Sequence, residues 1–252
     1  MTVCLYPIEN LPDIQEKDNL PLLIAKSLRE QRLDLEDNDI IVIAQKVVSK
    51  AEGRNVLLEE VEVSQEAKNL AQETGVTPEV VQLILQESSE ILKIRPGLII
   101  PRHRLGYICA NAGIDRSNTG RGDGKAVVLL PKDPDASAKE IREALEEEFD
   151  KKISVIINDS QGRPFREGAV GVAIGISGIA PIEEHINKVD LYGYTLKTSQ
   201  EGIVDELASA ATLLMGQSNE GIPAVLIRGF KYRAPDHSIK EIIREPHKDL
   251  FK

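Results

Sequence analysis

The amino-acid sequence predicts a mixed fold of helices and strands, of the α/β or α+β class. Runs typical of strands alternate along the chain with segments of helical periodicity. Of the 252 residues, 41% are hydrophobic and 29% are charged, a balance that lets a globular protein bury a sizeable core. No internal repeat or low-complexity linker marks a boundary, so we expect one large domain or two small lobes.

The first third of the chain is predicted to hold two strands and three helices. Strands are expected at 3–8 and at 40–48, and the second is apolar and β-branched enough to be buried. Asp18-Asn19 should cap a helix that has Pro21 in its first turn. Further helices are expected at 64–74, closed by Gly75, and from Pro78 onward behind the cap residue Thr77.

The remainder of the chain continues the alternation. Helices are expected at 135–149, where Ile141, Leu145 and Phe149 form one apolar stripe, and at 204–215. The charged C-terminal tail should be peripheral. The predicted strands are 98–100, 106–110, 126–130, 154–157, 169–176 and 223–228.

Charge and cysteine content exclude several classes of protein. The formal net charge of −10 leaves no basic footprint for duplex nucleic acid. No stretch reaches the roughly 18 consecutive apolar residues of a membrane helix, and no basic segment precedes an apolar run at the N-terminus. Only Cys4 and Cys109 are present, which suits a reducing compartment. We therefore expect a cytoplasmic protein with no nucleic-acid or membrane partner.

Familiar catalytic motifs are absent. The four histidines have no zinc-ligand spacing, and each is interpreted as a surface or loop residue. Residues 175–178 lack the spacing of a serine nucleophile elbow. The glycine-rich segment 120–125 fails as a phosphate-binding P-loop, because Ala126 replaces the hydroxyl residue and Thr119 the first glycine. A flexible loop between strands is the simpler interpretation of that segment.

Polar residues follow two apolar strands, and each group contains one carboxylate. Asp115 lies in the segment after the 106–110 strand, and Asp159 follows the 154–157 strand. Two carboxylates from separate strands, with hydroxyl or amide oxygens, suit a hard divalent cation that also holds phosphates. The alternative is that both are turn residues, favoured there by local hydrogen bonding. The pattern alone leaves both interpretations open.

Two further segments fit the same logic. Gln45, Lys46, Ser49 and Lys50 lie where the 40–48 strand should end, and lysine provides a mobile charge for phosphates. Exposed lysines beyond a strand are the alternative. The segment 215–223 is rich in turn formers, and alone it indicates only a loop.

Taken together and in order, six stretches resemble the coenzyme F420-0:L-glutamate ligase family over about residues 5–230. They are 45–53, 110–118, 158–166, 171–178, 190–193, and 213–217 with 221–224. The resemblance implies an α+β fold with two intertwined lobes, in which residues 1–252 form one ligase unit and an interlocked homodimer assembles. The nitroreductase-like domain fused to actinobacterial relatives is not expected here.

The resemblance also implies an activity. Such enzymes use GTP and a divalent metal, Mg²⁺ or Mn²⁺, and in this interpretation K⁺ can serve as well. They join L-glutamate to the lactyl carboxylate of F420-0 and then add a γ-linked glutamate. The proposed path runs through an acyl phosphate, which turns a poor acyl donor into one with a leaving group.

Carried over position by position, the resemblance assigns site residues. Asp115, Asp159 and Lys50 would be catalytic, and the metal ligands would be Asp115, Asp159, Ser160 and Gln217. The nucleotide site would comprise Leu11, Pro12, Asp13, Ile14, Gln45, Lys46, Lys50, Asn118, Met215, Gly216, Gln217, Ser218, Asn219, Glu220, Gly221 and Ile222. Arg163 and Arg166 are our own inference as donors to glutamate carboxylates or a substrate phosphate.

Three positions depart from common family residues. Relatives often have threonine at Ser160, and some carry glutamate at Gln217, where the amide here loses the charge. Tyr194 stands where relatives often have arginine, so a cationic substrate contact is not expected there.

Two alternatives to this activity stay open. One is γ-glutamylation of another acceptor, such as a folate. The other is a catalytically silent nucleotide-binding protein, against which the retention of Asp115, Asp159, Lys50 and Asn118 counts.

Overall fold

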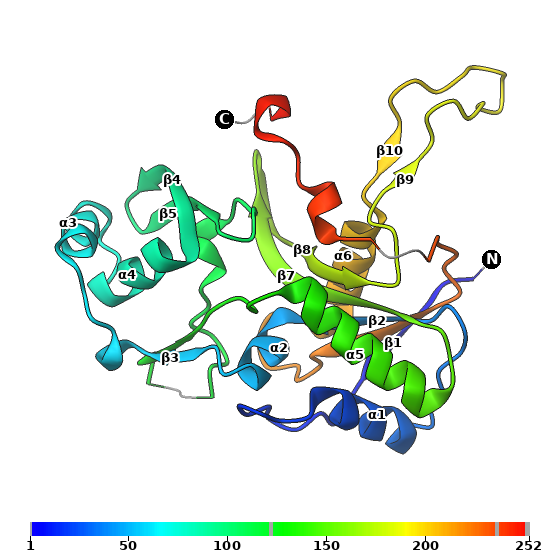
Figure 1. The fold of residues 1–252 in the computed structure, drawn as a ribbon, viewed down its shortest axis with the longest axis horizontal. Coiled ribbons are helices and arrows are strands. Elements are labelled where there is room, and N and C mark those ends of the chain that lie inside the picture. Colours follow the sequence, from blue (N-terminus) through cyan, green and yellow to red (C-terminus); the bar gives the residue numbers. More distant parts are fainter. Residues whose placement is uncertain (1, 121–122, 235–236, 250–252) are drawn as a thin grey trace.

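A five-stranded mixed sheet forms the centre of the protein, whose computed structural model describes residues 2–120, 123–234 and 237–249 (Figure 1). The strand order is β1-β11-β2-β7-β8. β2 and β7 are parallel, whereas the other neighbouring pairs are antiparallel. The strands are β1 (Cys4–Ile8), β2 (Ile40–Ala44), β7 (Ser154–Arg163), β8 (Arg166–Ser177) and β11 (Ala224–Arg228).

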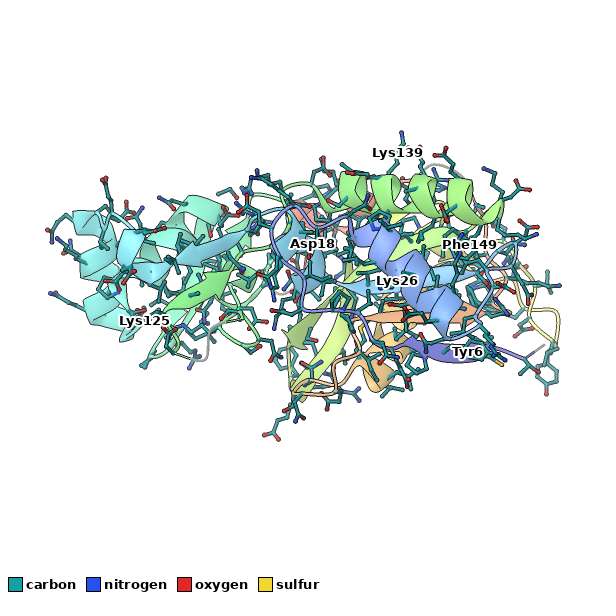
Figure 2. All side chains as sticks on the ribbon, turned by 90° about the horizontal axis from the view of Figure 1, so that it is seen from below. Tyr6, Asp18, Lys26, Lys125, Lys139 and Phe149 are labelled. Atoms are coloured by element: carbon teal, nitrogen blue, oxygen red, sulfur yellow. The ribbon has the colours of Figure 1, made fainter. Side chains whose placement is uncertain are left out.

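Helices cover both faces of this sheet. α1 (Leu20–Glu30) and α5 (Pro134–Phe149) lie side by side over one face, and Figure 2 shows Lys139 of α5 pointing outward. The Arg29 guanidinium lies 5.3 Å from the centre of the Phe149 ring, which joins the two helices. α6 (Ile203–Met215) packs on the other face, against β7 and β8.

Side-chain caps explain where these helices begin. Asn19 accepts a hydrogen bond from Leu22 N at 3.0 Å at the start of α1. Asp133 accepts one from Ala136 N at 3.1 Å at the start of α5. Both satisfy an amide that has no partner within the helix, and both helices have proline in the first turn.

A smaller lobe with its own core is inserted between β2 and β7, on the left of Figure 1. Its core includes Val81, Ile84, Ile99 and Val127, all of them buried. Its helices and strands are β3 (Asn55–Leu57), η1 (Leu58–Glu60), α3 (Gln65–Thr74), α4 (Pro78–Glu87), β4 (Ser88–Arg95), β5 (Leu98–His103), η2 (Ala110–Gly113) and β6 (Ala126–Val128). Two cores, one mixed sheet and separate two-stranded antiparallel sheets confirm the predicted α+β class.

The C-terminal third adds a projecting arm. β9 (Glu183–Glu184) and β10 (Gln200–Glu201) form its base, and the arm extends away from the sheet in Figure 1. Two short 3₁₀ helices follow the last strand, η3 (Ile239–Ile242) and η4 (Pro246–Lys248). Among the described residues, no helix combines the length and apolar character that crossing a membrane requires.

Several sequence predictions are confirmed and others are corrected by the structure. The helices predicted at 64–74, 135–149 and 204–215 form within one residue of those limits. The predicted strand 40–48 ends at Ala44, because its parallel pairing with β7 ends there and α2 (Gln45–Ala51) follows at once. The predicted strand 106–110 is a turn with one isolated bridge, Arg102 to Ile108, and the predicted strand 154–157 continues to Arg163 as a hairpin with β8.

A buried ionic cluster joins the small lobe to the chain that follows α2. Arg54 Nη2 lies 2.7 Å from Glu87 Oε2, and Arg104 Nη2 lies 3.1 Å from the same oxygen. His103 lies in β5 with an exposure of 0%, so its interpretation as a surface or loop residue is wrong. Leu105 N donates to His103 Nδ1, which leaves Nε2 facing Glu87 at 3.4 Å. The charge of Glu87 therefore organises the boundary between the lobes.

Candidate functional site

A pocket of about 740 Å³ lies where both lobes and the segment after α6 converge. Every residue predicted for the nucleotide and metal sites lines it: Leu11, Pro12, Asp13, Ile14, Gln45, Lys46, Lys50, Asn118, Met215, Gly216, Gln217, Ser218, Asn219, Glu220, Gly221, Ile222, Asp115, Asp159 and Ser160. The fold therefore brings together segments that are more than 200 residues apart, as from Leu11 to Gln217.

Helix α2 contributes two lysines to this pocket. It begins directly after β2, so Lys46 and Lys50 are one helical turn apart on an element anchored in the sheet. The Lys50 side chain is only 5% exposed and forms an ion pair with Asp13 from the loop before α1. Gln45 is buried, and its Oε1 accepts a hydrogen bond from Ser49 Oγ at 3.0 Å, which fixes the first turn of the helix.

Asp115 is held by both its backbone and its carboxylate. Its amide and carbonyl exchange hydrogen bonds with Val128 of β6, at 3.0 Å and 2.8 Å. Oδ1 accepts from Ser117 N and Ser117 Oγ, while Oδ2 lies 2.8 Å from Lys46 Nζ. Burial alone would raise the pKa of Asp115, but the hydrogen bonds from Lys46 and Ser117 outweigh it and lower that pKa. Asp115 is therefore a stable carboxylate.

Asp159 differs from Asp115 in that its pKa is raised, not lowered. It lies within β7, just after the register of the β7–β8 hairpin shifts between Ile157 and Asn158, and not at a strand end as the sequence suggested. Burial raises the pKa of Asp159 to about 6; hydrogen bonds from Gln161 and Ser160 oppose the rise, and the charge of Asp115 adds to it. A carboxylate in that condition favours a cation beside it.

The loop after α6 closes the pocket. Gln217 Nε2 donates to Ser160 Oγ at 2.8 Å, and Asn118 Nδ2 donates to the carbonyl oxygen of Ser218 at 2.9 Å. Ser218 N in turn donates to Glu220 Oε2 at 2.8 Å. These bonds tie the loop to β7 and to the segment that contains Asp115.

The donor set fits a divalent cation with few protein ligands. Among the residues that the structure describes, no group of three or more His, Cys, Asp or Glu side chains could hold a metal ion. Mg²⁺ commonly takes one or two carboxylates and completes its shell with water and substrate phosphates. Asp115 and Asp159 provide the two carboxylates, and Ser160 Oγ and the Gln217 amide provide neutral oxygens. The meeting of two carboxylates and two neutral oxygen donors in one pocket is the observation that supports this fit.

Asn158 is a pocket residue that the sequence analysis did not single out. Thr212 Oγ1 donates to the Ala208 carbonyl oxygen, so it must accept from Asn158 Nδ2 at 2.9 Å. This fixes the orientation of the amide and leaves Asn158 Oδ1 buried with no hydrogen-bond partner among the described residues. Its place next to Asp159 in the motif was the only sequence signal.

The two arginines assigned to substrate binding lie elsewhere. Arg163 and Arg166 flank the turn at the far end of the β7–β8 hairpin and do not line the pocket. Arg163 Nη1 donates to the Gly168 carbonyl oxygen at 3.0 Å. Tyr194 lies on the projecting arm, where it is 59% exposed. A substrate would have to extend from the pocket to reach any of these side chains.

Comparison with known proteins gives consistent matches. The family model described as F420-0:Gamma-glutamyl ligase matches residues 9–229. The Coenzyme F420:L-glutamate ligase of Methanothermobacter thermautotrophicus is 46% identical over 254 residues, covering 100% of both chains. The protein of the same name from Methanococcus maripaludis is 49% identical, and the match covers 86% of each chain. The one from Archaeoglobus fulgidus is 42% identical, and the match covers 100% of this chain and 97% of the relative. The chain belongs to the F420-0:gamma-glutamyl ligase family.

Proposed function

We propose that this protein is a GTP-dependent ligase that joins L-glutamate to the lactyl carboxylate of F420-0 and then adds a γ-linked glutamate. The observation that carries the proposal is the convergence of two lysines and two carboxylates, Lys46, Lys50, Asp115 and Asp159, in one pocket of a chain from this family. Several relatives are named as ligases of coenzyme F420 and L-glutamate.

The chain's own residues would bind and orient the nucleotide. Lys50 is buried and held by Asp13, so its charge is directed into the pocket at little cost in side-chain entropy. The segments 11–14 and 215–222 both line the pocket, and we expect them to contact the base and ribose. A bound Mg²⁺ or Mn²⁺ would neutralise the charge of the transferred phosphoryl group, with Asp115 and Asp159 as its principal ligands and Ser160 and Gln217 as neighbours. K⁺ is a further candidate in the same pocket.

The covalent chemistry follows from the substrates. An oxygen of the acceptor carboxylate attacks the γ-phosphorus of GTP, and GDP leaves. The amine of glutamate then attacks the acyl carbon, phosphate leaves with the bonding electrons, and the amine loses a proton to give the amide. Positioning and electrostatic stabilisation are the main contributions that a protein can make to such a transfer.

The acceptor is the part of the proposal that the pocket defines least. Arg163 and Arg166 are proposed to contact carboxylates or the phosphate of a long acceptor at the end of the hairpin. An interlocked homodimer belongs to the same proposal, and sedimentation velocity of the full chain would test it directly.

The test is product formation. The purified protein is incubated with F420-0, glutamate, GTP and Mn²⁺, and the products are followed by mass spectrometry. We expect glutamyl adducts that require GTP and disappear in Asp159→Asn. Asp34→Asn, a change of the same chemistry at an exposed carboxylate, is the matched control and should leave the adducts intact.

Two negative results have different meanings, depending on whether the protein turns over GTP with another acceptor. Folded protein that binds GTP but forms no adduct would exclude F420-0 as the acceptor, and a folate would be tested next. Binding of GTP without turnover on any acceptor would favour the silent nucleotide-binding alternative.

A further inference from the structure

Lys46 is bound tightly to the carboxylate that we assign to the metal. Its Nζ lies 2.8 Å from Asp115 Oδ2 and 2.8 Å from Ser117 Oγ, and the side chain is 19% exposed. Ser117 Oγ also donates to Asp115 Oδ1 at 2.8 Å. The three side chains therefore form a closed ring in which both carboxylate oxygens are engaged.

The ammonium of Lys46 also acts on the second carboxylate. The charged form of Asp159 is opposed by the charge of Asp115 and supported by that of Lys46. One monovalent cation, fixed to the protein, thus offsets part of the charge of a pair of carboxylates. This is the electrostatic task that a divalent metal would perform at the same oxygens.

The two cations cannot occupy this place together without strain. A divalent ion held by the Asp115 carboxylate would lie close to Lys46 Nζ, and like charges at one carboxylate repel strongly in a half-buried site. Lys46 has a four-carbon stem that can turn away from Asp115. On the same side of α2, Lys50 is held by Asp13, and we expect phosphates to lie beside these two lysines, so a bound nucleotide would give a displaced Lys46 a strongly anionic partner.

We propose that Lys46 occupies the metal's place on Asp115 in the ligand-free protein and moves to the nucleotide phosphates when the metal binds. This inference rests on the proposed function, because it takes the pocket as the site of both nucleotide and metal. Lys46 is thus a positioning residue that couples the two ligands. Because such coupling is reciprocal, each ligand increases the affinity for the other through this side chain.

Lys46→Met should change the affinities for Mn²⁺ and GTP in opposite directions, which ordinary structural damage would not do. Lys46→Met removes the competing charge, so Mn²⁺ should bind the nucleotide-free protein more tightly, by about tenfold. The same variant should bind GTP more weakly in the presence of EDTA, also by about tenfold, because a phosphate contact is lost. Titration calorimetry with each ligand alone measures both affinities, and electron paramagnetic resonance of Mn²⁺ gives the first independently.

Two variants serve as controls. Lys50→Met removes the same charge one turn along the same helix but from a different carboxylate, so it should weaken GTP binding and leave Mn²⁺ affinity within about twofold. Lys46→Arg keeps the charge and should restore the weak Mn²⁺ binding of the natural protein.

The outcomes separate this inference from the function itself. If Lys46→Met binds Mn²⁺ equally or more weakly than the natural protein does, Lys46 only supports the site and the inference fails while the function stands. If the natural protein binds neither Mn²⁺ nor GTP, the proposed function and the inference fail together. Opposite shifts of the two affinities in Lys46→Met support the inference.

Discussion

Arg54 and Glu87 join the two lobes through an ion pair of 2.7 Å between Nη2 and Oε2. Arg54 follows α2, the helix of the pocket lysines, and its Nε also donates to the Leu130 carbonyl oxygen at 2.9 Å. Glu87 ends α4 of the small lobe. One buried carboxylate therefore connects the small lobe to the chain that follows the helix of the pocket lysines.

Glu87→Gln should destabilise the protein at neutral pH. Burial would raise the pKa of Glu87, but the His103 ring 3.4 Å away, the hydrogen bond from Arg54 and the charge of Arg104 outweigh it and lower that pKa to about 2. A lowered carboxylate pKa contributes stability that is fully present above the unfolded value of 4.5 and lost as pH falls toward 2. We expect a loss of about 3 kcal/mol in the free energy of unfolding at pH 7. Urea denaturation measures it.

Glu90→Gln is the matched control for that change. Glu90 is 58% exposed and lies 3.4 Å from Arg102, so its loss should cost less than about 1 kcal/mol. Equal effects of the two substitutions would show that the buried cluster does not hold the lobes together.

Asp159→Asn should stabilise the metal-free protein. The folded-state pKa of Asp159 is raised from 3.8 to about 6, so its contribution to stability is present below pH 3.8 and is lost as pH rises through 6. Removing the charge should raise the free energy of unfolding by about 1 to 3 kcal/mol at pH 8 and by little near pH 4. Denaturation in EDTA across this range tests the sign.

Asp115→Asn provides the opposing case. Its pKa is lowered in the fold, so the same substitution should destabilise the protein at pH 8. Stabilisation by both substitutions would mean that Lys46 does not support Asp115.

Gln217→Glu should strengthen metal binding in the presence of nucleotide. Gln217 Nε2 donates to Ser160 Oγ at 2.8 Å, so a carboxylate at this position would face the proposed ligands. Affinity for hard cations rises with ligand charge, and we expect about a tenfold gain for Mn²⁺. Calorimetric titration in a nonhydrolysable GTP analogue measures the gain; unchanged affinity would remove Gln217 from the ligand set.

Gly171→Ala should disturb the packing of α6 against β8. A Cβ there would lie 2.3 Å from Thr212 Oγ1 and 2.4 Å from the Ala208 carbonyl oxygen. The helix would have to move, at about 1 to 3 kcal/mol of stability, and thermal denaturation would record the loss. Gly162→Ala lies on the partner strand with nothing within 4 Å of its Cβ, so it should be neutral. If neither Gly171→Ala nor Gly162→Ala lowers the melting temperature, α6 can shift against β8 without loss of stability.

The helices were predictable from the sequence because their signals are local. Asn19, Ser64 and Asp133 accept the capping hydrogen bonds, and Gly75 takes the left-handed conformation at the end of α3. These features act over three or four residues and need no tertiary information.

Elements that depend on pairing were predicted less well. The segment 45–48 contains two valines and was expected to extend the strand, but the chain turns into α2 directly after Ala44, where its pairing with β7 ends. The strand β4 was missed because its exposed, mixed sequence pairs only with β5. His103 was misassigned because its burial depends on Glu87 and Arg104, which no spacing rule connects.

The site was anticipated through its motifs, and the pattern alone could not assemble it. Asp115 and Asp159 were also compatible with ordinary turns, and only the fold shows that they share a pocket with Lys46 and Lys50. The mutual effect of the two carboxylates depends on their distance in space, which no single segment encodes.

The strand order of the central sheet has a consequence for synthesis on the ribosome. β11 lies between β1 and β2, although it is translated more than 170 residues after either of them. The small lobe can complete its core from one contiguous stretch, residues 56–129, soon after that stretch emerges. The main sheet must wait with an open gap until residues 224–228 arrive, and the walls of the pocket at 215–223 arrive just before them. The nascent chain would thus expose an unpaired β1 and β2 for most of its elongation, which is the period when it most needs protection from aggregation.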